Sequence, residues 1–239
     1  MPSQQIHLGE MPVDVVRKDI KNVHLSVHPP TGRVTIAAPS HMSLDSIRVF
    51  AITKLSWIRR EQKKMREQDR EAPREFLERE SHYVWGKRYL LHVTEVDAPP
   101  TIQLRHKRML LQVRPGTSRE KCQTLVEEWY RHQIREAVSP LIEYWEKRLG
   151  VKVDRIFVQR MKTKWGSCNP STHSIRLNTD LAKKPPECLE YIVVHELMHL
   201  LEPTHNARFQ SLMDQHHPKW RSHQQTLNRL PVRHESWGY

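Results

Sequence analysis

The stretch YIVVHELMHLL, residues 191–201, decides how this chain is interpreted. Its two histidines are four residues apart, so on a helix His195 and His199 lie on the same face. Glu196 lies beside them, and most of the other residues are apolar. A helix this apolar is buried, and buried imidazole and carboxylate groups need partners. The spacing is that of the H-E-x-x-H motif, in which two histidines bind zinc and the glutamate acts as general base of a peptidase.

A third zinc ligand is expected beyond that helix. Pro203 ends the helix, and the chain can then fold back to present His205 to the same ion. Three protein ligands leave a fourth coordination position for water, which is the pattern of catalytic zinc sites. The sequence therefore predicts one Zn²⁺ ion held by His195, His199 and His205, with Glu196 as the catalytic base.

Hydrophobic periodicity along the rest of the chain predicts both strands and helices. Ser43 and Ser118 are good N-caps for two long helices, and Pro140 could kink or divide the second one. No internal repeat is evident. The expected strands lie within 11–38, 81–114, 153–160 and 173–178, and the expected helices are 43–70, 118–150, 186–201, 206–216 and 218–230.

Charge and cysteine content indicate the cellular compartment and the kind of partner to expect. The 239 residues carry a net charge of +12, a field that attracts polyanions, so nucleic acid is a candidate partner for the basic surface. The three cysteines, Cys122, Cys168 and Cys188, are few and odd in number, which argues against a disulfide framework and for a reducing compartment. No pair has C-x-x-C spacing, so a zinc knuckle of thiolates is not expected. The first residues lack the apolar core expected of a signal peptide, and no apolar run is long enough to cross a bilayer. We expect a cytoplasmic protein that does not enter the membrane; its oligomeric state is not indicated.

Further blocks accompany the zinc motif. RMKTKWGSC at 160–168 and IRLN at 175–178 precede it, and THNARF at 204–209 and HPKW at 217–220 follow it. Together they resemble the YgjP-like metallopeptidase domain, a zincin group related to the WLM and SprT families. The resemblance spans most of the chain and is strongest over 155–228.

This resemblance implies an α+β fold. We expect a β-rich region with one long helix over 1–117, followed by a zincin-like metallopeptidase domain over 118–239 with an active-site helix and a small sheet. The strand at 173–178 would be the edge beside which an extended substrate lies, pairing through main-chain hydrogen bonds. The substrate-binding residues would then be Trp165, Ser167 and Asn178. For the WGSC block as a whole, however, a tight turn that packs its tryptophan in the core is the stronger expectation.

The expected function is hydrolysis of peptide bonds in a protein or peptide substrate by a zinc-activated water. Two alternatives stay open. One is a basic nucleic-acid-associated protein whose zinc site is structural or degenerate, and the other is a zinc amidohydrolase that acts on small substrates. The candidates for stabilising the oxyanion are Arg208, Tyr191 and His223, and those for accepting an imidazole N–H are Glu202 and Asp214.

Overall fold

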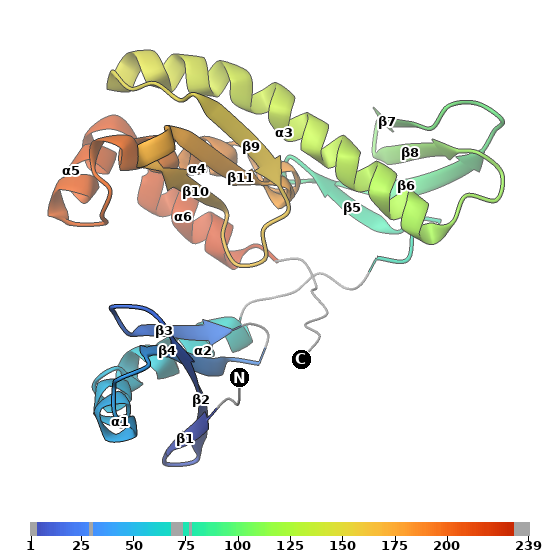
Figure 1. Ribbon diagram of the computed structural model, residues 1–239. Helices are drawn as coiled ribbons and strands as arrows, with labels where there is room; N and C mark the ends of the chain where they lie inside the picture. The colour runs from blue at the N-terminus through green and yellow to red at the C-terminus, as the bar shows by residue number, and fades with distance from the viewer. Residues whose placement is uncertain (1–3, 29–30, 68–73, 77, 232–239) are drawn as a thin grey trace. The chain divides into compact units, whose positions relative to one another are not determined.

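The computed structural model describes residues 4–28, 31–67, 74–76 and 78–231, which form α-helices and several small β-sheets (Figure 1). The predicted α+β class is therefore confirmed. The chain divides near residue 70 into two compact units. None of the helices in these described ranges is long and apolar enough to span a membrane.

The first unit is a four-stranded sheet with two helices. Its strand order is β1-β2-β4-β3; the central pair is parallel and both outer pairs are antiparallel. Alternating valine and isoleucine side chains of the strands form one core with Ile47, Ala51 and Ile58 of the helices. The elements are β1 (Gln4–Leu8), β2 (Met11–Lys18), β3 (His24–His28), β4 (Arg33–Pro39), α1 (Leu44–Thr53) and α2 (Leu55–Glu67). The single helix expected over 43–70 is thus two helices, separated at Lys54.

The second unit begins with a sheet of the same topology. Its order is β5-β6-β8-β7, again with a parallel central pair and antiparallel outer pairs. A helix follows each of the two sheets, and each of these helices has a serine N-cap that accepts a hydrogen bond from the backbone N–H three residues later. The serines are Ser43 and Ser118. The elements are β5 (Ser81–Val84), β6 (Lys87–Glu95), β7 (Thr101–Arg105), β8 (Arg108–Val113) and α3 (Arg119–Leu149). A repeated topology is therefore present where the sequence showed no repeat.

The expected domain boundary at residue 117 falls inside the second unit. Side chains of the sheet such as Leu91 and Leu111 belong to the same apolar core as Val126 and Ile134 of α3. The hydroxyl of Tyr130 on α3 also donates to the carbonyl of Tyr83 at 2.8 Å. Packing between sheet and helix, which no local pattern reveals, joins these segments into one unit.

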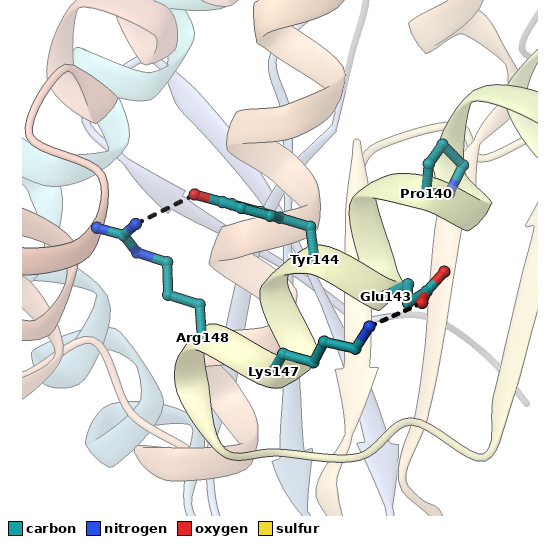
Figure 2. A pocket seen from close by; sticks show the side chains of 5 residues that line it. All are labelled: Pro140, Glu143, Tyr144, Lys147 and Arg148. Atoms are coloured by element: carbon teal, nitrogen blue, oxygen red, sulfur yellow. Dashed lines mark hydrogen bonds and ion pairs between the residues drawn. The ribbon is translucent and has the colours of Figure 1, made fainter.

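Helix α3 runs unbroken through Pro140 and ends at Gly150, which adopts the left-handed conformation of a helix C-cap. Figure 2 shows a surface hollow along one side of this helix, lined by Pro140, Glu143, Tyr144, Lys147 and Arg148. Lys147 pairs with Glu143, and Arg148 donates to the Tyr144 hydroxyl. None of the predicted site residues lines this hollow.

The histidine motif lies in the rest of the second unit, where a three-stranded sheet of order β10-β11-β9 packs against α3 and the helix that carries the motif (Figure 1). The elements are β9 (Arg155–Gln159), β10 (Gly166–Asn169), β11 (Ser174–Asn178), α4 (Pro186–Leu201), α5 (Ala207–His216) and α6 (Trp220–Arg229), with short 3₁₀ helices η1 (Pro170–Thr172) and η2 (Thr179–Lys183). Helix α4 contacts β10, β11, α3, α5 and α6. Most of its isoleucine, valine and leucine side chains are buried, as a helix surrounded on several sides requires.

Two expectations about this sheet are wrong. The WGSC block is not only a tight turn, because Gly166–Asn169 pairs with β11 as a strand. The strand at 173–178 is not an edge: it lies between β10 and β9, so β10 is the edge strand that contacts the histidine helix.

Candidate metal centre

Three imidazoles converge at the end of α4. His195 and His199 share one face of the helix, and His205 comes from the loop between α4 and α5. One nitrogen from each ring lies within 4.8 Å of the others, and the Nε2 atoms of His195 and His205 are 3.0 Å apart. Among the residues that the structure describes, these three histidines form the cluster of potential metal ligands whose atoms lie close enough to hold one ion.

The two imidazoles on α4 are held in the protonation state that a metal ligand needs. Burial lowers the pKa of His195 to about 3, and the neighbouring His199 and His205 add to the shift. Burial also lowers the pKa of His199. Neutral imidazole has a lone pair to donate, so the chemistry of this donor set fits a divalent cation such as zinc.

Glu196 is buried against strand β10. Its carboxyl group is so close to Gly166 that a Cβ atom at that position would lie 2.6 Å from Oε1, and 2.8 Å from Cγ2 of Ile192. Glycine is therefore required where the strand crosses the helix. Burial raises the pKa of Glu196 to about 8, while the positive charge of Lys164 opposes that rise. A cation bound nearby would oppose it further.

Strand alternation places Cys168 on the same side as Gly166. Burial and then the charge of Glu196 raise the pKa of the Cys168 thiol to about 11, which agrees with that placement. Ser167 points to the opposite face of the strand. Its predicted contact with substrate would therefore not come from the side of the sheet that carries Glu196.

The loop that carries His205 is fixed by Glu202. The backbone carbonyl of Glu202 faces Nδ1 of His199 at 3.2 Å, which leaves Nε2 of that ring for a metal. Its carboxylate accepts hydrogen bonds from the backbone N–H and hydroxyl of Thr204 and lies 3.9 Å from Arg208. Nδ1 of His195, by contrast, is buried and has no hydrogen-bond partner among the residues that the structure describes.

The other residues suggested for stabilising the oxyanion or for accepting an imidazole N–H have hydrogen-bond partners other than the three converging histidines. Asp214 accepts a hydrogen bond from the Trp220 indole at 2.8 Å and pairs with Arg221. His223 lies 3.0 Å from His217 through their ring nitrogens. Tyr191 is buried edge-on to His195, and its hydroxyl bonds to Gln224. No oxyanion donor is assigned among them.

Trp165 and Asn178 shape the loop that precedes β10. The backbone N–H of Asn178 donates to the Trp165 carbonyl at 2.9 Å, and the tryptophan packs against the core with Lys184 Nζ 5.7 Å from its ring centroid. The side-chain amide of Asn178 donates to the carbonyls of Met161 and Lys164 at 2.8 and 2.9 Å. Its Oδ1 accepts from the N–H of Asp180. The contacts of Asn178 are those of a residue that holds the loop.

Replacing Asn178 by alanine is expected to lower the free energy of unfolding by about 1–3 kcal/mol, because two carbonyls and two backbone N–H groups lose a partner. Urea unfolding followed by circular dichroism measures the effect. Asn228→Ala, at an exposed position of α6, is the control and should change stability by less than about 0.5 kcal/mol. Equal stability of the two variants would contradict this role for Asn178.

The comparisons with known proteins agree with this site. A family model described as the YgjP-like metallopeptidase domain matches residues 21–230. The chain belongs to the YgjP-like metallopeptidase family. The resemblance inferred from the sequence motifs is confirmed, and the YgjP-like match includes the three histidines and most of the first unit. No curated protein matches the chain.

Two solved structures are similar to parts of this YgjP-like chain. The crystal structure of the metallopeptidase zymogen abylysin of Pyrococcus abyssi is 22% identical, with a TM-score of 0.35, over 40% of this chain and 99% of that one. That of the jannalysin zymogen of Methanocaldococcus jannaschii is 21% identical, with a TM-score of 0.33, over 39% and 86%.

Two residues with a place in the site were not predicted from the sequence. Gly166 is needed for the approach of strand to helix, and Phe209 packs against all three imidazoles. A signal for Phe209 does exist in the sequence, because Asn206 is a good N-cap and puts Phe209 in the first turn of a helix directly after His205.

Proposed function

We propose that this YgjP-like metallopeptidase hydrolyses peptide bonds with one zinc ion bound by His195, His199 and His205, and with Glu196 as general base. The convergence of three imidazoles, two of them on the helix that also carries the buried carboxyl group of Glu196, is the observation that carries the proposal. A bound zinc ion would polarise the attacking water and the scissile carbonyl. Three ligands leave it a free coordination position for these groups.

Glu196 has the position and environment of a proton carrier. It follows His195 directly in α4, and its carboxyl group is not one of the three converging donors. Burial raises its pKa to about 8, and a zinc ion bound nearby would lower it again, so that the carboxylate could take a proton from water and later release it to the leaving amine. Gly166 of β10 leaves the carboxyl group little room on the side of the strand.

The free edge of β10 is the expected binding site for an extended substrate. Asn178 and Trp165 form a hydrogen-bonded pair of the antiparallel β10–β11 ladder. Because such pairs alternate along a ladder, the backbone groups of Gly166 and Cys168 point away from β11. A peptide could therefore pair with β10 as a further strand beside Glu196. This replaces the edge expected at 173–178.

The variant Gly166→Ala tests how closely strand and glutamate are coupled. The added methyl group has no room beside Glu196 Oε1, so the carboxyl group must move. We expect kcat/KM for a peptide substrate to fall by about 100-fold, the effect of a displacement near 1 Å in a catalytic group, with zinc still bound.

Ser167→Ala is the matched control for Gly166→Ala, because its side chain points to the other face of the same strand. It should retain activity within a few-fold of wild type. Full activity of Gly166→Ala would show that Glu196 does not need its observed position.

The two alternative functions make different demands on the site. A structural zinc site has four closed ligands, whereas the cluster has three members in the described ranges. The net charge of +12 keeps nucleic acid open as a partner. DNA binding that weakens with salt and survives Glu196→Gln, without any proteolysis, would favour the nucleic-acid alternative. Cleavage of dipeptides or acetylated amines but not of proteins would favour the amidohydrolase.

Cleavage profiling tests the proposal as a whole. The zinc-loaded chain is incubated with a mixture of cellular proteins, with and without DNA, and the new peptide termini are identified by mass spectrometry. We expect new termini with the wild type and none with Glu196→Gln. Identical termini from both proteins would contradict the proposal.

A further inference from the structure

Phe209 contacts every imidazole of the histidine cluster. Its ring centroid lies 5.0 Å from that of His195 and 4.9 Å from those of His199 and His205. The three imidazole centroids are themselves 4.6 to 5.0 Å apart. The four rings therefore occupy the corners of a nearly regular tetrahedron.

The phenyl ring is the buried corner of this arrangement. Phe209 is 2% exposed, whereas His205 is exposed. The phenyl ring stacks on His199 with an interplanar angle of 30° and meets His195 and His205 at 69° and 67°. Stacked and T-shaped pairs are the arrangements that aromatic rings prefer. Each contact thus favours one orientation of its imidazole.

A single helix cap places both the third histidine and the phenyl ring. Oδ1 of Asn206 accepts a hydrogen bond from the backbone N–H of Phe209 at 3.0 Å and so begins α5. His205 comes directly before this cap, and Phe209 lies in the first turn after it. Met213, one turn further on, is fully buried and anchors the same face of α5 in the core.

We propose that Phe209 is a positioning residue for the metal: its ring holds His195, His199 and His205 in the orientation in which they bind a zinc ion. The inference rests on the proposed function. Without the ring, the imidazoles gain rotational freedom that metal binding must remove again, so affinity falls although all three ligands are present. Leucine fills part of the space but offers no planar surface to the imidazoles.

The test compares zinc affinity and Co²⁺ absorption spectra of the full-length chain and its variants. For Phe209→Leu we expect the zinc dissociation constant to rise by about 10-fold or more, the range seen when a residue that orients a ligand is lost. The visible spectrum of bound Co²⁺ should change as well, because it reports the ligand geometry. Phe209→Tyr retains the ring and should restore both properties toward wild type.

Met213→Ala controls for stability, because it removes buried volume from the same helix and leaves Phe209 in place. It should lower the unfolding temperature yet keep the wild-type zinc affinity and Co²⁺ spectrum. Phe209→Met, which keeps more buried volume, carries the same expectation as Phe209→Leu and replaces it should that variant not fold. Wild-type affinity and spectrum in the Phe209 variants would overturn the inference. Equal weakening by Met213→Ala would also overturn it, and a wild type that binds no zinc would overturn the proposed function together with it.

Discussion

Replacing Glu196 by glutamine is expected to lower kcat/KM for peptide hydrolysis by about 10²–10⁴-fold, the usual contribution of a general base. Glutamine has nearly the same shape, but its amide cannot accept the proton of the attacking water. The zinc content should stay at the wild-type level, since Glu196 is not one of the three converging donors. Hydrolysis of a fluorogenic peptide and metal analysis of the same sample measure the two properties together.

Glu187→Gln is the control for Glu196→Gln. Glu187 lies in the first turn of the same helix and is exposed, so its charge can be removed without change at the cluster. Wild-type activity is expected. If Glu196→Gln retained activity within about twofold of wild type, another group would have to take the proton.

Replacing His199 by alanine is expected to abolish zinc binding and hydrolysis together. Two of the three donors would remain, and the ring that stacks on Phe209 and faces the Glu202 carbonyl would be lost. The loss of affinity should exceed the roughly 10–100-fold effect of losing a residue that only orients a ligand. Zinc per chain after dialysis and the rate of peptide cleavage measure the outcome.

His132→Ala is the matched control for the histidine variant. His132 lies on α3, and its side chain is 64% exposed. The His132→Ala variant should therefore bind zinc and cleave peptides like the wild type. Retention of zinc and full activity by His199→Ala would remove this residue from the proposed ligands.

The parts of the fold that follow from short-range patterns were predictable from the sequence. The serine caps at Ser43 and Ser118, the stop at Gly150 and the apolar helix around His195 each depend on residues within a few positions. The same holds for the pairing of His195 with His199. The helical period fixes their shared face before any tertiary contact is known.

The parts that depend on distant pairing were missed. The strand at Gly166–Asn169 has a weak strand composition and forms through its ladder with β11. The topology of the first sheet is repeated in the second, but the side chains that line the strands differ, so no repeat is visible in the sequence. The boundary expected at residue 117 lies inside the second compact unit, because a core shared by sheet and α3 is a property of packing.

The candidate site divides in the same way. His195, Glu196 and His199 follow from helical spacing, and His205 follows from the break at Pro203. The closeness of Gly166 to Glu196 depends on a strand that crosses the helix. Helical spacing cannot reveal that contact, because the two residues are 30 positions apart in the sequence.

The zinc content of the purified chain tests the central claim most directly. The full-length protein is loaded with zinc, dialysed against metal-free buffer and analysed by inductively coupled plasma mass spectrometry. The account predicts one zinc ion per wild-type chain, and background levels in a variant with alanine at His195, His199 and His205. A folded wild-type chain that retains no zinc, or a triple variant that retains as much as the wild type, would contradict it.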